Sequence, residues 1–207
     1  MKRRRYVILF FFVLLVGTFI VLKKNDVEPE KFIEKNLNIN ERKYTIGEPV
    51  DSFNGVYVYY NGKVSHVSGR NVAPDGYNLG QKYQCVEFVK RYYYEHLHHK
   101  MPDSYGHAKD FFDPKLKDGQ KNKCRGLFQY TNPSKQKPRP DDLVVYSGTS
   151  LNKFGHVAII SKVSSNEIEI VQQNPGPYAS SRATYPLKKA NGKWKIENDR
   201  ILGWLRK

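Results

Sequence analysis

Two cysteines and six histidines are the side chains of this sequence that are best suited to nucleophilic chemistry. Cys85 stands at the start of a predicted helix, in QCVEFVKRYY. A thiol in the first turn of a helix lies beside unpaired N–H groups and the positive end of the helix dipole, and both favour the thiolate. The turn-rich approach DGYNLG at residues 75–80 would leave this thiol accessible. Cys85 is therefore the candidate nucleophile.

A nucleophilic cysteine needs a base, normally a histidine, and a polar group that orients the imidazole. His156 has the most suitable setting, because it opens a buried strand predicted over residues 156–163 and follows Gly155, which permits close backbone approach. A second strand follows after a short loop. A three-residue loop would place Asn174 opposite His156 and Gln172 on its diagonal. Both amides remain candidates for the orienting group.

A cluster of histidines at the end of the predicted helix could indicate a metal site. His96 with His99, and Glu95 with His98 or His99, have the helical spacing that paired ligands need. No further ligands are evident in the sequence, so a solvated helix end is the favoured interpretation. We expect no metal and no organic cofactor.

The hydrophobic pattern predicts the elements that must position these groups. Residues 84–96 form a helix, with Cys85, Phe88, Val89 and Tyr92 on one face. Helices come first and antiparallel strands follow, which predicts an α+β domain. The other predicted elements are a hairpin of residues 56–60 and 63–67 around Asn61-Gly62, a short helix at 107–112, strands at 143–146, 156–163, 167–173 and 201–205, and loops at 113–123 and 130–142.

The N-terminus carries a membrane-targeting pattern. A basic cluster at residues 2–5 precedes an apolar run at residues 6–22, and Lys23 and Lys24 close it. The run would span about 25 Å as a helix, near the lower limit for crossing a bilayer, and the basic flank predicts a cytoplasmic N-terminus. A cleaved signal peptide is the alternative, although no small-x-small cleavage site follows. Either interpretation places the rest of the chain outside the cytoplasm.

Three segments follow from this pattern. Residues 1–24 are expected to be a signal anchor and transmembrane helix, residues 25–43 a polar linker, and residues 44–207 the domain. In an exported protein the two cysteines could also pair, and a Cys85–Cys124 disulfide would close a loop of about forty residues. Nucleophile and disulfide are therefore competing interpretations of Cys85.

Composition limits the class of partner. An apolar fraction of 39% with 14% aromatic residues is enough for a core, and it excludes wholesale disorder. The formal net charge of +15 favours anionic partners, or else provides a solubilising surface. The charge is spread along the chain instead of forming one dense block, so a nucleic-acid partner is not expected.

The motifs QCVEF, GHVAII and QQN, in this order and spacing, resemble the CHAP family of cysteine, histidine-dependent amidohydrolases/peptidases. NGVYVYYN at 54–61, GQKY before the cysteine and PDDLVVY at 140–146 extend the resemblance. The ending ILGWL at 201–205 is similar to the amidase domain of glutathionylspermidine synthetase/amidase.

The resemblance implies a papain-like α+β fold, in which an antiparallel sheet packs on the Cys-bearing helix. It also implies that Cys85 is the nucleophile and His156 the general base. Gln172 stands where the family commonly has a glutamate, and Asn174 matches an asparagine that often follows. An amide can hold one imidazole tautomer but cannot stabilise imidazolium as a carboxylate does, so a catalytically weak relative stays open.

The resemblance and the N-terminal pattern together predict a membrane-anchored, extracytoplasmic cysteine amidohydrolase or endopeptidase. Its expected substrate is an amide bond of peptidoglycan peptides, and its expected membrane contact is the N-terminal helix. Two alternatives stay open, a glutathionylspermidine-type amidase and an envelope-binding module with little catalytic activity.

Overall fold

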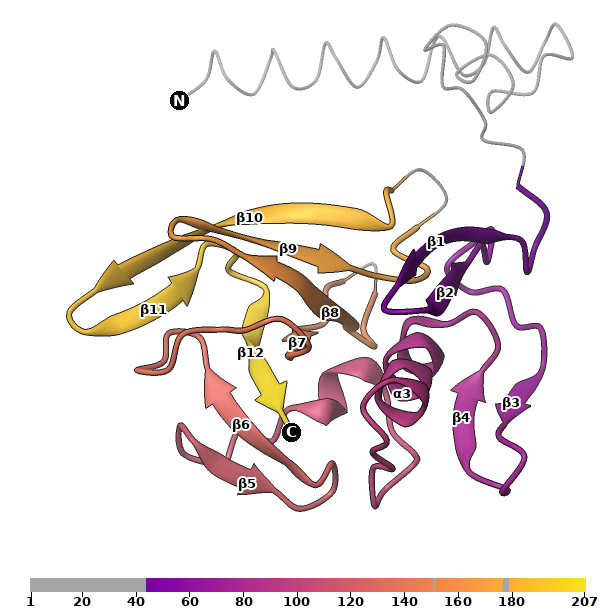
Figure 1. Ribbon diagram of the computed structural model, residues 1–207, viewed down its shortest axis with the longest axis horizontal. Helices are drawn as coiled ribbons and strands as arrows, with labels where there is room; N and C mark the ends of the chain where they lie inside the picture. Colours follow the sequence, from indigo (N-terminus) through magenta and orange to yellow (C-terminus); the bar gives the residue numbers. More distant parts are fainter. Residues whose placement is uncertain (1–43, 151, 177–178) are drawn as a thin grey trace, which may run out of the picture. The chain divides into compact units, whose positions relative to one another are not determined.

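The computed structural model describes residues 44–150, 152–176 and 179–207, and an antiparallel sheet is the largest element of that part (Figure 1). The sheet has eight strands in the order β11-β10-β9-β8-β7-β12-β6-β5. Its strands are β5 Gln120–Asn122, β6 Leu127–Thr131, β7 Leu143–Tyr146, β8 His156–Val163, β9 Glu167–Val171, β10 Arg182–Ala190, β11 Lys193–Ile196 and β12 Ile201–Arg206.

Smaller elements precede and cover this sheet. Helix α3, Cys85–Glu95, packs against β8, and the short 3-10 helix η1, Ala108–Phe111, packs against β7 and β8. Two hairpins complete the fold: β1 Pro49–Phe53 with β2 Val56–Tyr59, and β3 Arg70–Val72 with β4 Asn78–Gln81. Strand β4 leads almost directly into α3, which fixes where that helix begins.

The two faces of the sheet bury different side chains, because successive residues of a strand point to opposite sides. The face toward α3 presents alternate residues of β7 and β8, and the helix adds aromatic side chains to the same core. This core includes Phe88, Val89, Tyr92, Tyr93, Leu143, Val145, Val157 and Ile159. The opposite face buries a second cluster, which includes Val144, Ala158, Ile160, Ile168, Ile170 and Trp204.

The predicted α+β arrangement is confirmed for the described residues, where antiparallel strands pack on a Cys-bearing helix. Strands β7 and β8 have the predicted bounds, and α3 begins one residue later than predicted. The segments predicted as membrane anchor and linker, residues 1–24 and 25–43, lie outside the described residues. No helix within the described residues is long and apolar enough to cross a membrane.

The predicted hairpin around Asn61-Gly62 is wrong. Strand β2 pairs with β1 across Asn54-Gly55, so the turn lies one Asn-Gly pair earlier in the chain. The segment after Asn61 forms turns instead of a strand, and its side chains Val64 and Val67 are exposed. The buried amide of Asn61 donates to the carbonyls of Lys63 and His66 and so stabilises a local turn.

Several strands were not predicted, because they are short, polar or irregular. β5 lies inside the predicted loop 113–123, and β6 continues into the predicted loop 130–142. β10 carries Pro186 and several charged residues, so its alternation is weak. The other unpredicted strands are β1, β3, β4 and β11.

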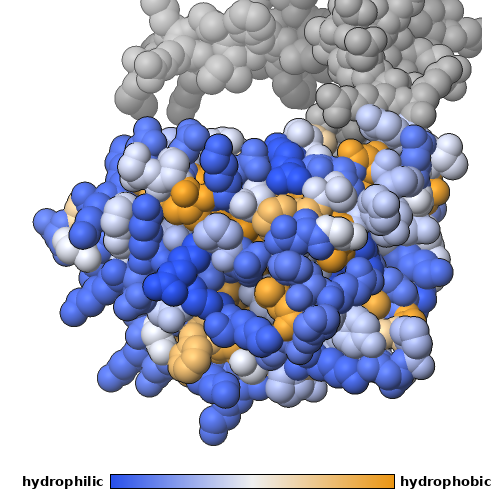
Figure 2. All heavy atoms as spheres, in the orientation of Figure 1, coloured by the Kyte–Doolittle hydropathy of each residue, from blue (hydrophilic) through white to orange (hydrophobic). Residues whose placement is uncertain are grey.

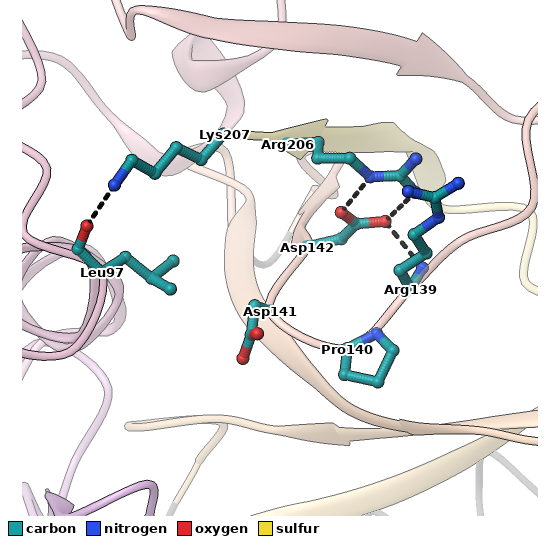
Figure 3. Close-up of a pocket in the computed structure, with 7 residues that line it drawn as sticks. All are labelled: Leu97, Arg139, Pro140, Asp141, Asp142, Arg206 and Lys207. Atoms are coloured by element: carbon teal, nitrogen blue, oxygen red, sulfur yellow. Dashed lines mark hydrogen bonds and ion pairs between the residues drawn. The ribbon is translucent and has the colours of Figure 1, made fainter.

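Asp142, which directly precedes β7, has a structural role. Asp142 is 1% exposed, and its carboxylate accepts hydrogen bonds from Arg206 Nε at 2.7 Å and Nη2 at 2.6 Å (Figure 3). The backbone N–H of Arg139 donates to the same carboxylate at 2.8 Å. Burial still raises the pKa of Asp142 despite the ion pair with Arg206. This pair ties the last strand to the start of β7.

Removing Arg206 should therefore destabilise the fold. Arg206→Met leaves a buried carboxylate without its cation, which should lower the free energy of unfolding by about 3 kcal/mol. Adding Asp142→Asn to Arg206→Met removes the stranded charge and should recover a large part of that loss. Urea denaturation at pH 7 measures both. A double variant no more stable than Arg206→Met would contradict the electrostatic explanation.

Candidate active site

Cys85 is the first residue of α3, and the residue before it leaves the helix start open. Gln84 has extended backbone angles and makes no side-chain cap to the helix. Its side chain points elsewhere, because its Nε2 donates to the carbonyls of Val64 and His66 and its Oε1 accepts from Asn174. The first N–H groups of α3 thus remain available to another acceptor.

The Cys85 thiol is half-buried and has backbone donors around it. Burial raises the pKa of this thiol to about 11, although hydrogen bonds from the N–H groups of Val157, Val86 and Cys85 itself oppose the shift. Hydrogen bonds to the sulfur favour the thiolate over the thiol. Both cysteines are free, Cys124 being exposed, so the structure contains no Cys85–Cys124 disulfide.

His156 is the first residue of β8, and its backbone neighbours bring it beside the thiol. Val157, which follows it, supplies one of the N–H groups on the Cys85 sulfur. Gly155 before it has φ +76°, and a Cβ there would lie 2.5 Å from the carbonyl oxygen of Tyr146. Only glycine fits this position without strain, so the approach to His156 depends on it.

A hydrogen bond to Gln172 orients the His156 ring and selects one tautomer of the imidazole. Its Oε1 lies 2.9 Å from His156 Nε2, and its Nε2 donates to the carbonyl oxygen of Ser180 at 3.0 Å. Because the amide nitrogen already serves Ser180, the amide oxygen must be the acceptor for the ring. The network therefore places the imidazole proton on Nε2 and leaves the lone pair on Nδ1, as a general base for the thiol requires.

The pKa shifts of His156 and Cys85 favour the neutral imidazole and the neutral thiol in the free protein. Burial lowers the pKa of His156 to about 4; the hydrogen bond that the ring donates to Gln172 opposes this shift, and the positive charge of Arg200 adds to it. The thiol of Cys85 is also neutral at pH 7, because its pKa is raised. In this state the thiol keeps its proton and the imidazole lone pair is free, and both pKa shifts oppose the thiolate–imidazolium pair.

Asn174 occupies a different position from Gln172. Its Nδ2 donates to Gln84 Oε1 at 2.7 Å and to the carbonyl of Val64 at 3.1 Å. It has left the strand with φ +55°, although the β8–β9 register extrapolates to place it opposite His156. The structure therefore brings Gln172 to the imidazole and Asn174 to the residue that precedes Cys85.

A buried polar network next to these residues was missed by the sequence analysis. Gln173 is fully buried, and its Nε2 donates to Glu87 Oε2 at 2.7 Å and to the carbonyl of Gln84 at 3.0 Å. Glu87 also accepts from Arg91 Nε at 2.6 Å and from Asn71 at 2.8 Å. The signal was present, since Glu87 and Arg91 are four residues apart on the helix, but this spacing is also typical of solvated faces.

The family model described as CHAP domain matches residues 75–174, which contain Cys85, His156, Gln172 and Asn174. The chain is also 31% identical over 144 residues to trypanothione synthetase of Crithidia fasciculata. That match covers 68% of this chain and 22% of the relative, so the chain spans about a fifth of the relative's length. The recognition of a CHAP domain is confirmed, and such a domain implies amidase or peptidase activity.

Two solved structures also match with low overall similarity. One is described as the crystal structure of Ly7917, with 16% identity and a TM-score of 0.36, and the match covers 67% of this chain and 56% of that chain. The other is described as Ly7917 with the hydrolyzing product of MDP, with 23% identity, a TM-score of 0.26, and coverage of 36% and 30%.

Loss of the Gln172 amide should slow turnover. In Gln172→Ala the ring loses the partner that fixes its tautomer, and we expect kcat to fall at least tenfold, or about 1.4 kcal/mol of transition-state stabilisation. Gln172→Glu should retain activity and move the acidic limb of the pH profile upward, because a carboxylate favours imidazolium and so raises the pKa of the base. Steady-state kinetics across pH measures both effects.

Asn174→Ala is the matched control, since it removes an amide two residues away that contacts Gln84 instead of His156. It should cost less than Gln172→Ala. Unchanged kcat for Gln172→Ala with a collapse for Asn174→Ala would transfer the orienting role to Asn174. If neither variant is impaired, the site works as a Cys-His dyad.

Proposed function

We propose that this CHAP-domain chain is a cysteine amidohydrolase or endopeptidase with a papain-like arrangement of its catalytic groups. One observation carries the proposal: His156 at the start of β8 is held through Nε2 by Gln172, and helix α3, which begins with Cys85, packs against β8. Nucleophile, base and orienting amide thus come from three separate segments and meet at one end of β8.

The reaction follows from these positions. His156 Nδ1 takes the thiol proton as the Cys85 sulfur attacks the amide carbonyl carbon, and the N–H groups of Cys85 and Val86 stabilise the oxyanion. The imidazolium then gives its proton to the leaving nitrogen, the C–N bond breaks, and an acyl-enzyme forms. Water, deprotonated by His156, attacks the thioester and releases the acid and the free thiol.

Peptidoglycan peptides are the proposed substrate. The predicted signal anchor would hold the domain beside the cell wall, and a net charge of +15 suits an anionic envelope. The face seen in Figure 2 is largely hydrophilic with only small apolar areas, which fits work on a polar polymer. A glutathionylspermidine-type amidase is the second candidate, favoured by the similarity to trypanothione synthetase.

Digestion of purified cell wall tests the reaction. The protein should release new amine and carboxyl ends detectable by mass spectrometry, and Cys85→Ala should lower that rate at least about 1000-fold, because the nucleophile is lost. Cys124→Ala is the matched control and should keep full activity. Wall binding without new ends would favour a binding module, and cleavage of glutathionylspermidine alone would favour the second candidate.

We also propose that the chain is anchored in the membrane by residues 6–22, with the domain outside the cytoplasm. The support is the sequence pattern, a basic cluster before an apolar run without a cleavage site. The full-length protein should pellet with membranes after a carbonate wash, and protease added to intact spheroplasts should digest the domain. A soluble mature chain that begins after Lys24 would refute the anchor.

A further inference from the structure

A free guanidinium lies beside the proposed base. The Tyr146 and His156 rings have centroids 5.7 Å apart, and Arg200 Cζ lies 6.0 Å from the Tyr146 centroid. Arg200 Nη2 donates to the carbonyl of Ser147 at 3.3 Å, and Ser147 is the residue that follows the end of β7. Arg200 is exposed, and its charge reaches His156 strongly enough to lower the pKa of that imidazole.

Among the described residues, no carboxylate pairs with Arg200. Within residues 44–150, 152–176 and 179–207, no carboxylate oxygen lies within 4 Å of its guanidinium. Its neighbour Asp199 is fully exposed and lies 3.9 Å from Lys195 Nζ instead. The guanidinium therefore keeps donors for an outside acceptor.

Charged residues of both signs lie near the start of β8. Lys153 holds its ammonium 5.4 Å from the Phe154 ring, and Lys109 packs against Gly155. The nearby acid Asp110 accepts the backbone N–H of His107. The side-chain partner of His156 is the neutral Gln172, and Arg200 is the charged group that acts on the pKa of His156.

We propose that Arg200 is a substrate-binding residue that receives a carboxylate of the substrate beside His156. The preferred substrates would then be amides that carry a carboxylate close to the scissile bond. A guanidinium suits this task, because its planar set of donors matches a carboxylate and it stays charged at any relevant pH. This inference rests on the proposed function, since it assumes that Cys85 and His156 perform the reaction.

Alkylation of the thiol tests the subsite without a known substrate. Iodoacetate and iodoacetamide form the same S–C bond with loss of iodide and of the thiol proton, and they differ only in carboxylate against carboxamide. Digestion and mass spectrometry give the rate at Cys85 and at the exposed Cys124 in the same sample. At each cysteine, the rate with iodoacetate is divided by the rate with iodoacetamide. The value at Cys85 divided by the value at Cys124 is the ratio that reports local attraction for a carboxylate.

The ratio should fall at least about threefold in Arg200→Ala, as expected for a guanidinium several ångströms from the reagent in a partly solvated site. Arg200→Lys should retain part of the preference. Lys193→Ala is the matched control, because it removes the same charge from an exposed position on the β10–β11 hairpin and should leave the ratio unchanged. High salt should shrink the difference between the wild type and Arg200→Ala.

Two failures are distinguishable. A ratio unchanged in Arg200→Ala, or lowered equally by Lys193→Ala, would overturn the subsite while leaving the nucleophile in place. If Cys85 reacts with neither reagent in the folded protein while Cys124 reacts with both, the proposed function itself fails. A change of thiol basicity in Arg200→Ala alters both reagents alike and cancels in the ratio.

Discussion

The site depends on one buried contact, the hydrogen bond between Gln173 and Glu87. Gln173 follows Gln172, which binds the His156 ring, and Glu87 is two residues after Cys85 on α3, so this contact joins the segment after β9 to the helix that begins with the thiol. Loss of this contact would be costly, because a buried carboxylate such as that of Glu87 needs hydrogen-bond partners. Arg91 and Asn71 complete the carboxylate's partners, which makes the contact a stable reference for the positions of both reactive groups.

The same arrangement explains why three neighbouring amides have three separate tasks. Gln172 holds the imidazole, Gln173 joins the strand to Glu87, and Asn174 binds the Gln84 side chain that would otherwise be free to cap α3. Occupying Gln84 in this way leaves the first N–H groups of the helix for the oxyanion. The QQN motif therefore affects the surroundings of both Cys85 and His156, although only its first residue contacts the His156 ring.

The sequence predicted the parts of the fold that have strong patterns. β7 and β8 are continuous apolar runs, and α3 has an apolar face, so their bounds could be predicted from burial alone. The hairpin was placed at the wrong Asn-Gly pair, because local turn chemistry is identical at both and only tertiary burial of Val56 and Val58 decides between them. Which amide reaches His156 was likewise undecidable, since it depends on where β9 ends and on the Ser180 carbonyl across the following loop.

The neutral amide at position 172 fits the remainder of the site. A carboxylate there would place an oxygen against the Ser180 carbonyl, where Gln172 now donates, so the glutamate common in the family would need a different partner in this loop. Without that negative charge, burial keeps both Cys85 and His156 neutral, and Arg200 further disfavours imidazolium. In the proposed mechanism, the compensating negative charge comes with the substrate. A carboxylate bound at Arg200 would offset the repulsion between guanidinium and imidazolium as the proton moves from sulfur to nitrogen, so substrate binding itself would support the ionised pair.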